Sequence, residues 1–300
     1  MSHAKKSDPA YIRTILSQTP IDMVLSDLDG TLLDPNSQVP EAVVDAVKRL
    51  TETGIRFMVA SGRPKMAVLE TMAALEIEEP YIAGGGAYVA DPRTDQSILH
   101  TPLSREAVEK IVFLARQVGV SILFEELEIA FQESTDEIAA RLKGMAGFPI
   151  PRTDDILSFS NNPTTKIVLM GDPDVLSALD PALAALSEHA HVATTFPIFR
   201  DITAAGITKG TALKALARYT HISSDRILAI GDGWNDKSMF DSAALGVAVA
   251  NATSDVLEIA DLIVPSNADH GVAWLIQQVI ETRAPAATRS SDQMSTGRQT

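Results

Sequence analysis

Asp27 and Asp29 stand two residues apart, directly after the apolar run 21–25 and just before Gly30. If a strand ends at Asp27, its side chain points off the carboxyl edge of a sheet, and Gly30 can take the positive φ that bends the backbone around a ligand. Two acids at such a turn suit a phosphate group held together with a divalent cation. Asp and Gly also begin ordinary turns, so a purely structural role is the alternative.

Three further segments carry polar side chains where an apolar run ends or a helical run begins. Because the chain alternates between short apolar runs and helical runs around them, these segments are expected at the same mouth as the two acids. The residues are Ser61, Gly62 and Arg63 after the run 55–60, Lys209 before the run 210–219, and Asp232, Asn235 and Asp236 after the run 226–230.

With these four segments in this order, the sequence resembles the haloacid-dehalogenase-type phosphatases of the Cof-like group, whose large cap lies between the second and third motifs. The resemblance spans about residues 21 to 280 and is stronger in the core than in the cap. It implies an α/β fold, with a Rossmann-like parallel-sheet core and an inserted α+β cap. It also implies Mg²⁺-dependent hydrolysis of a small phosphorylated metabolite, with sugar phosphates favoured as substrates and phosphorylated cofactors next.

Hydrolysis of a phosphate monoester needs a nucleophile, a proton donor for the leaving oxygen, and cations that neutralise the phosphoryl oxygens. Asp27 is the expected nucleophile, which would form an aspartyl-phosphate that water later cleaves. Asp29 is the expected general acid and then general base. The resemblance assigns the same two roles and adds the backbone carbonyl of Asp29 as a metal ligand.

Four aspartates converging on one mouth would repel one another, so a hard divalent cation is expected there. Mg²⁺ fits because it prefers oxygen ligands and takes one or two carboxylates together with a substrate phosphate oxygen. The predicted metal ligands are Asp27, Asp29 and Asp232. Asp236 and Asn235 are expected to orient metal-bound water and Lys209, and a helix N-cap pair is the alternative for them.

The phosphate itself needs positive charge and N–H or O–H donors. Lys209 is expected to screen the nucleophile from the phosphate, although a surface lysine is the ordinary alternative. The Ser61 hydroxyl and the Gly62 amide would form an anion site at a helix N-terminus, or Ser61 would act only as a cap. Arg63 either reaches the phosphate or braces the loop. The expected phosphate contacts are Ser61, Gly62, Lys209 and Asn235, with supporting roles for Asp236, Arg63, Thr31 and Asn251.

Two positions depart from the pattern of Cof-like phosphatases. Gly85 stands where those proteins usually carry Asn, which predicts the loss of one side-chain amide near the substrate. Leu257 stands where they often place Lys, which predicts the loss of a support for the acidic loop. These departures keep a non-catalytic phospholigand-binding protein as an alternative.

A phosphosugar mutase is the other alternative, because an aspartyl-phosphate can also deliver its phosphoryl group to a second sugar hydroxyl. Beta-type phosphoglucomutases carry a small helical cap between the first two motifs. Only about thirty residues separate Thr31 from Ser61, which leaves little room for such a cap.

The spacing of apolar runs divides the chain into a split core and an insertion. Alternating strands and helices predict a parallel sheet covered on both faces, and the mixed pattern between them predicts an α+β unit that includes a helix over 133–143. The small polar residues at the two ends predict disorder. The expected parts are a flexible segment 1–19, a core of 20–84 and 205–282, a cap of 85–204 and a disordered tail 283–300.

Composition narrows the class of protein. The 300 residues are 45% hydrophobic, which is enough for a sizeable core, and a net charge of −14 argues against a nucleic-acid partner. No cysteine is present, so thiol nucleophiles, disulfides and thiolate zinc sites are excluded. No apolar segment reaches the length of a membrane span, and the first residues lack the apolar core of a secretory signal. We therefore expect a cytoplasmic enzyme with a small-molecule substrate and no membrane partner, and leave its oligomeric state open.

Overall fold

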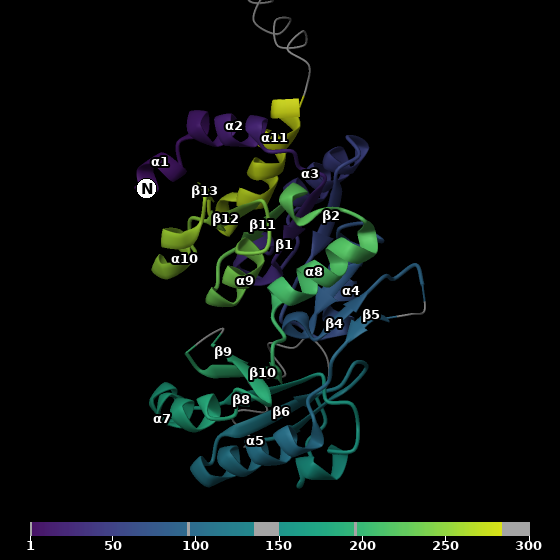
Figure 1. Ribbon diagram of the computed structural model, residues 1–300, viewed down its shortest axis with the longest axis vertical. Coiled ribbons are helices and arrows are strands. Elements are labelled where there is room, and N and C mark those ends of the chain that lie inside the picture. Colours follow the sequence, from purple (N-terminus) through teal and green to yellow (C-terminus); the bar gives the residue numbers. More distant parts are fainter. Residues whose placement is uncertain (1, 95–96, 135–149, 195–196, 284–300) are drawn as a thin grey trace, which may run out of the picture.

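The computed structural model describes residues 2–94, 97–134, 150–194 and 197–283. Figure 1 shows two parts stacked along the long axis of the molecule, with a parallel sheet in the upper part and an antiparallel sheet in the lower part. The upper part is the core and the lower part is the cap. The predicted fold class is confirmed. Among the described residues, no helix combines the length and the apolar character that a membrane span requires.

The core is built around a five-stranded sheet in the order β13-β12-β11-β1-β2. All neighbouring strands in it run parallel, so their carboxyl ends meet at one edge. The central strand β1 pairs with strands that lie far apart in the sequence, because Leu25 is opposite both Met58 and Ala229. The strands are β1 (Met23–Ser26), β2 (Arg56–Val59), β11 (Ile227–Gly231), β12 (Leu245–Val249) and β13 (Leu262–Val264).

Helices cover this sheet because each carries one apolar face. In α3, Val43, Ala46, Val47 and Leu50 recur at helical spacing and are all buried. The core helices are α3 (Glu41–Glu52), α4 (Lys65–Ala74), α8 (Lys209–Thr220), α9 (Lys237–Phe240), α10 (Ser254–Ile259) and α11 (Gly271–Arg283). Short helical turns lie at Leu28–Leu32, Gly84–Gly86, Ser224–Arg226, Trp234–Asp236 and Asn267–Asp269.

The N-terminal segment differs from the prediction of a flexible stretch over 1–19. Residues His3–Lys6 form α1 and Pro9–Gln18 form α2. The Asp8 side chain accepts a hydrogen bond from the Ala10 amide and so caps α2, and Ile12 and Leu16 are buried in the core cluster. Helix α2 packs against α11 (Figure 1), so burial of an apolar stripe orders a segment that its polar composition had suggested was loose.

A small antiparallel sheet lies beside the end of β2, where Ala60 forms a single bridge with Ile82. It consists of β3 (Tyr81–Ala83), β4 (Tyr88–Ala90) and β5 (Ser97–His100). The side chains of Tyr88 and Val89 belong to the core hydrophobic cluster. The predicted cap boundary at residue 85 therefore falls too early, because pairing with β3 holds this hairpin on the core.

The cap sheet has the order β7-β6-β8-β10-β9, with every described pair antiparallel. Its strands are β6 (Ser121–Glu125), β7 (Ala130–Glu133), β8 (Lys166–Met170), β9 (Ala190–Ala193) and β10 (Phe199–Ala204), and its helices are α5 (Arg105–Val118), α7 (Pro173–Ala184) and a short turn at Ile156–Phe159. Glu133 ends β7, and the rest of the helix predicted over 133–143 lies mainly outside the described residues. The tail predicted to be disordered over 283–300 lies, apart from Arg283, outside them as well.

The two faces of the cap sheet have different neighbours. Ile122, Phe124 and Leu169 pack with residues of α5 and α7, which lie on the side turned away from the core in Figure 1. Leu123 and Val168 belong to a separate cluster on the opposite face and border a cavity next to the core. The alternation along each strand thus gives the cap one face for its own core and one face for the site.

Candidate active site

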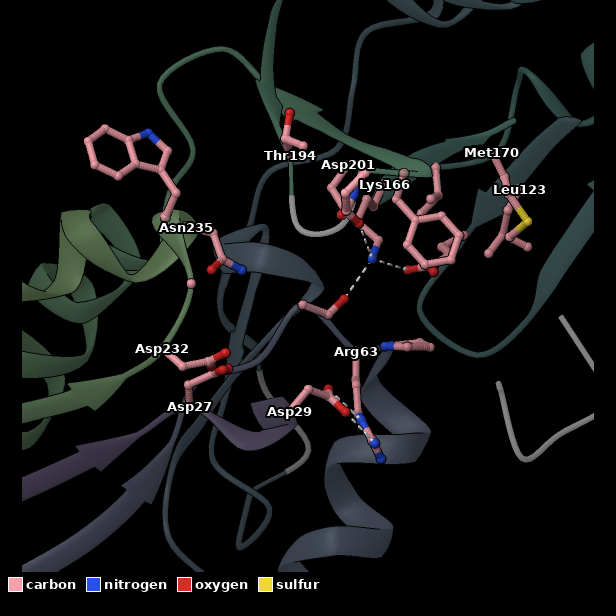
Figure 2. Close-up of a pocket in the computed structure, with 18 of the residues that line it drawn as sticks. Asp27, Asp29, Arg63, Leu123, Lys166, Met170, Thr194, Asp201, Asp232 and Asn235 are labelled. Carbon is pink, nitrogen blue, oxygen red and sulfur yellow. Dashed lines mark hydrogen bonds and ion pairs between the residues drawn. The ribbon is translucent and has the colours of Figure 1, made fainter. Parts of the chain in front are cut away.

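A cavity of about 780 Å³ lies between the carboxyl edge of the core sheet and the cap sheet. Figure 2 shows its two sides, with Asp27, Asp29 and Asp232 on the core and Lys166, Asp201 and Leu123 on the cap. Acidic side chains from strand ends thus face a cap surface across one cavity. The core residues that line it are Asp27, Asp29, Gly62, Arg63, Pro64, Ala67, Asp232, Gly233, Trp234, Asn235, Asn251, Thr253 and Asp255.

Asp27 follows β1 and is held by a buried lysine. Lys209 Nζ lies 2.6 Å from Asp27 Oδ1 and also 2.6 Å from Asp236 Oδ1, and Lys209 is only 1% exposed. Burial alone would lower the pKa of Lys209, but the charges of Asp236 and Asp27 outweigh it and raise this pKa. The ordinary surface-lysine alternative therefore does not apply to Lys209, which stays a cation between two carboxylates.

Asp236 is fully enclosed by donors. Its Oδ1 accepts from Lys209, and its Oδ2 accepts from the backbone amides of Asp232 and Gly233, each at 3.0 Å. The residue is completely buried. Asp236 therefore holds the turn after β11 and contacts Lys209 at the same time. Its side chain makes no N-cap hydrogen bond to α9, and its expected effect on metal-bound water stays a prediction.

Asp232 approaches the first acidic turn closely. Thr31 Oγ1 donates to Asp232 Oδ1 at 2.8 Å. Gly30 has φ of 75°, and a Cβ placed on it would lie 2.4 Å from Asp232 Oδ2. Position 30 thus requires glycine for two reasons, because the backbone is left-handed and because no side chain fits beside the carboxylate.

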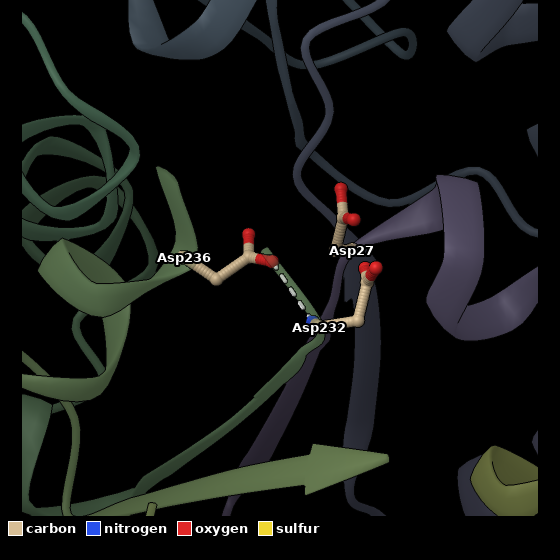
Figure 3. Close-up of side chains that lie close together, drawn as sticks. All are labelled: Asp27, Asp232 and Asp236. Atoms are coloured by element: carbon tan, nitrogen blue, oxygen red, sulfur yellow. Dashed lines mark hydrogen bonds between the residues drawn. The ribbon is translucent and has the colours of Figure 1, made fainter. Parts of the chain in front are cut away.

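The three carboxylates Asp27, Asp232 and Asp236 offer oxygens that all lie within 4.8 Å of one another. Figure 3 shows these three side chains gathered at the ends of the strands. Burial and then the charge of Asp236 raise the pKa of Asp27 well above its usual range, against the opposing effect of Lys209. Burial and Asp236 also raise the pKa of Asp232 to about 6. Crowded, buried carboxylate oxygens are a donor set that fits a hard divalent cation, which would relieve this repulsion.

Asp29 is the acid of the first turn that stands apart from this cluster. Its carboxylate accepts two hydrogen bonds from Arg63, at 2.8 Å from Nε and 2.6 Å from the terminal nitrogen. Figure 2 shows this pair on the core side of the cavity, and Arg63 stands two residues before α4 begins at Lys65. Of the two roles considered for Arg63, the described contacts favour bracing, because its guanidinium orients the Asp29 side chain.

The loop after β2 contains Ser61, which is fully buried. Its hydroxyl oxygen accepts from the Arg63 amide at 3.0 Å, and its carbonyl accepts from the Gly85 amide at 3.0 Å. Helix α4 begins only at Lys65, with Pro64 as its N-cap residue, so Ser61 holds the turn and does not cap the helix. Its expected contact with phosphate stays a prediction, as does that of Gly62, which lines the cavity.

Two asparagines border the acidic loops. Asn235 points into the cavity in Figure 2. Asn251 Nδ2 donates to the Gly30 carbonyl at 2.7 Å, and its Oδ1 accepts from the Asn267 amide at 2.9 Å. Asn267 in turn donates to the Leu33 carbonyl at 2.8 Å. Asn251 thus contacts the turn that the sequence predicts it to support, and Asn267 is a second brace that no sequence pattern had singled out.

The two departures from the family pattern have visible local consequences. Gly84, Gly85 and Gly86 all have positive φ, so this turn uses the conformational freedom of glycine where an Asn side chain is absent. A Cβ on Gly85 would lie 3.8 Å from Thr203, in ordinary contact. Leu257 packs against the core cluster, so an apolar contact occupies the position where a lysine was expected.

Three charged cap residues on the cavity wall were missed from sequence. Glu125 ends β6, Lys166 begins β8 and Asp201 lies within β10. Lys166 Nζ lies 3.0 Å from Asp201 Oδ1 and donates to the carbonyl of Gly62 at 2.6 Å. A charge within or at the end of an apolar run was the available signal, but only the cap sheet brings these three strands together.

The comparisons with known proteins agree with this geometry. The family model of the haloacid dehalogenase-like hydrolases matches residues 24–276, from the first core strand to the last core helix. The chain belongs to this family. The matched span includes both the acidic core residues and the cap residues that face them.

Two named relatives of this haloacid dehalogenase-like hydrolase are phosphatases. The 5-amino-6-(5-phospho-D-ribitylamino)uracil phosphatase YitU of Bacillus subtilis is 25% identical over 261 residues, which cover 85% of this chain and 96% of that protein. The HMP-PP phosphatase of Cronobacter sakazakii is 26% identical over 232 residues, which cover 77% of this chain and 85% of that protein.

Solved structures show the same fold. A haloacid dehalogenase-like hydrolase from Bacteroides thetaiotaomicron has a TM-score of 0.78 and 27% identity, with 86% of this chain and 99% of that chain covered. The present chain is therefore a phosphatase of this family, a hydrolase of phosphate monoesters.

Proposed function

We propose that this enzyme hydrolyses its substrate with Asp27 as the nucleophile, in a reaction that requires Mg²⁺. The observation that carries the proposal is the position of Asp27. It is buried at the end of β1 and borders the cavity, in contact with Lys209 and clustered with Asp232. A carboxylate held in this way is oriented for attack on phosphorus, and Lys209 offsets the repulsion between it and the incoming phosphate.

Asp27 and Asp232, with the backbone carbonyl of Asp29 as the family resemblance suggests, would hold Mg²⁺. The ion would supply positive charge against the phosphoryl oxygens. Asp236 is a weaker candidate ligand, because both of its oxygens already accept hydrogen bonds. Its proposed role is to fix Lys209 and the turn that carries Asp232.

Asp29 is the proposed proton carrier. It would protonate the leaving oxygen as the bond to phosphorus breaks, and then take a proton from the water that cleaves the aspartyl-phosphate. Its bidentate contact with Arg63 supports this assignment, because the contact keeps the Asp29 side chain away from the three clustered carboxylates. Arg63 is therefore proposed as a positioning residue.

The cap is proposed to exclude water and to contact the leaving group. Lys166 of the cap donates to the Gly62 carbonyl, and Glu128 of the cap pairs with Lys65 of α4. These contacts bridge the cavity on the side of residues 61–63, the loop that is proposed to bind phosphate. A covered site strengthens the electrostatic interactions inside it and limits unproductive hydrolysis.

The substrate belongs to the small phosphorylated metabolites, with sugar phosphates and phosphorylated cofactors as the two classes to compare. Two relatives are named for a ribityl-uracil phosphate and for HMP-PP, which supports including phosphorylated cofactor precursors. Identities near 25% leave the choice to the residues of this chain's own cap.

The test is release of inorganic phosphate from 4-nitrophenyl phosphate and from a panel of sugar and cofactor phosphates. It compares the wild type with Asp27→Asn, with Mg²⁺ or with chelator. We expect turnover that requires Mg²⁺ and that Asp27→Asn abolishes. The matched control is Asp45→Asn on the exposed face of α3, which should behave as the wild type. Mg²⁺-independent turnover, or an active Asp27→Asn variant, would contradict the proposal.

A further inference from the structure

The cavity-facing side of the cap sheet is divided into an apolar part and a charged part. The apolar part is contiguous, because Leu123 is opposite Val168 and Met170 is opposite Phe199 in the register of the sheet. Ile150 joins them in one hydrophobic cluster, and all five residues line the cavity. We call these five residues the apolar wall.

Beside the apolar wall lie the three charged residues Glu125, Lys166 and Asp201. In the register, Glu125 is opposite Lys166 and Val168 is opposite Asp201, so the charged group adjoins the wall directly. Two carboxylates and one ammonium group give this charged group a net charge of −1 when all three are ionised. Lys166 directs its ammonium group at Asp201 and at the Gly62 carbonyl, which leaves little of its charge for a ligand.

The carboxylate of Glu125 is buried and, within the described ranges, lacks a hydrogen-bond donor at one of its oxygens. It is 4% exposed and borders the cavity, and its Oε2 has no hydrogen-bond partner among the described residues. Lys166 Nζ lies 3.4 Å from this oxygen without forming a hydrogen bond to it. Burial raises the pKa of Glu125, against the opposing charge of Lys166. A buried carboxylate oxygen without a donor is costly, so it marks a place where a donor from a bound molecule would be favourable.

We propose that the cap selects phosphate esters whose leaving group is a largely apolar ring that carries one N–H donor or ammonium group. The ring would lie against the apolar wall, and its donor would reach the acidic pair Glu125 and Asp201. This inference rests on the proposed function of the same cavity and names its substrate class.

The same surface disfavours the other substrate classes. A sugar or polyol phosphate would place several hydroxyl groups against five side chains that offer them no hydrogen bond. A leaving group with a second anion would meet the excess negative charge of Glu125 and Asp201. The apolar wall and the acidic pair thus discriminate in the same direction.

The experiment uses the full-length enzyme and four related phosphate esters. They are 4-(aminomethyl)benzyl phosphate, 4-methylbenzyl phosphate, 4-carboxybenzyl phosphate and glucose 6-phosphate. We expect kcat/KM to fall in that order, with at least about a tenfold step between the aminomethyl and methyl compounds for one charge-assisted hydrogen bond. A preference for glucose 6-phosphate or for the carboxybenzyl compound would overturn the proposal.

Two isosteric variants test whether the acidic pair causes the preference for the aminomethyl compound. Glu125→Gln and Asp201→Asn keep the size of the two side chains and remove their charge, so each should reduce the ratio of kcat/KM for the aminomethyl compound to kcat/KM for the methyl compound. Val168→Thr has nearly the same shape and should reduce turnover of both benzyl compounds relative to glucose 6-phosphate. If the preference for the aminomethyl compound is unchanged in both acidic variants, the assignment to Glu125 and Asp201 is wrong.

A binding measurement separates this proposal from the proposed function. The corresponding phosphonates cannot be hydrolysed, and calorimetric titration of the wild type with them reports affinity without turnover. The expected order of affinity is aminomethyl, methyl and then carboxyl, even if none of the esters is cleaved. Equal affinities for all three phosphonates would overturn the substrate class, whereas the expected order without any phosphate release would instead overturn the catalytic proposal alone.

Discussion

The core and the cap each bury one lysine between two carboxylates, and the two clusters differ in how well they are satisfied. In the core, Lys209 contacts Asp27 and Asp236 at 2.6 Å each. In the cap, Lys166 lies 3.0 Å from Asp201 and 3.4 Å from Glu125, one of whose oxygens has no hydrogen-bond partner within the described parts of the chain. The contacts between lysine and carboxylate are therefore shorter in the core cluster than in the cap cluster.

This difference follows from the positions of the residues in the two sheets. The core acids follow the ends of parallel strands, where the backbone amides of Asp232 and Gly233 hold the Asp236 carboxylate in place. The cap residues stand on neighbouring antiparallel strands, where cross-strand spacing fixes the backbone but leaves the side chains to adjust. A fixed cluster suits a reaction common to a family, and an adjustable one suits recognition of a particular leaving group.

The largest expected effect is that of Lys209→Met compared with Lys166→Met. Loss of Lys209 should lower kcat about 1,000-fold, because a preorganised charge at the reacting phosphate is removed. It should also lower the free energy of unfolding by about 3 to 5 kcal/mol, because two buried carboxylates lose their cation. Steady-state kinetics with 4-nitrophenyl phosphate and chemical denaturation measure both quantities.

The matched variant Lys166→Met should lower kcat much less and act mainly through KM. In the loop 61–63, the hydrogen-bond partner of Lys166 is the backbone carbonyl of Gly62. Its two carboxylate partners belong to the cap. Equal losses of kcat in the two variants would show that the two clusters are not functionally distinct.

The next effect is that of Asp29→Asn, which removes the proposed proton carrier but keeps the shape of the side chain. For an alkyl phosphate such as glucose 6-phosphate we expect kcat to fall about 100-fold or more. For 4-nitrophenyl phosphate the fall should be smaller, because that leaving group departs without a proton. Kinetics with both substrates check this, and an equal fall for both would argue for a purely structural role of Asp29.

Gly30→Ala tests the close approach inside the core cluster. The new Cβ would lie 2.4 Å from Asp232 Oδ2 on a backbone with φ of 75°, so the carboxylate must move. We expect the apparent affinity for Mg²⁺ to fall about tenfold, measured by activity against Mg²⁺ concentration. Gly54→Ala is the control, because Gly54 has φ of 85° with nothing within 4 Å of the added Cβ. It shares the backbone strain but should leave Mg²⁺ affinity unchanged.

The smallest effect concerns the stability of the cap cluster. Burial raises the pKa of Glu125 in the folded state, so its contribution to stability is fully present below the pKa of an unfolded glutamate, about 4.3, and is lost as the pH rises through the folded value. The thermal midpoint of Glu125→Gln should therefore rise relative to that of the wild type as the pH increases above about 4.3. Glu52→Gln on the exposed end of α3 should show no such trend. A constant or falling difference for Glu125→Gln would contradict the assignment of burial as the dominant cause.

Much of the core followed from the sequence because its signals are local. Apolar runs that end in Asp27, Ser61 or Asp232 mark strand ends, and parallel strands bring such ends to one edge of the sheet. The motif order also identified the family. The N-terminal helix α2 was missed because its stability comes from burial of Ile12 and Leu16 against the rest of the core, which no property of the segment alone reveals.

The sequence by itself thus determined the acidic residues, the nucleophile candidate and the class of fold, because these depend on residue types and on short spacings. Only the tertiary structure decided that Asp29 pairs with Arg63 and that Asn267 braces the acidic loop. It also decided that Glu125, Lys166 and Asp201 form one group on the cavity wall. The physical reason is that these contacts join residues distant in sequence, through sheet register and loop packing that have no local pattern.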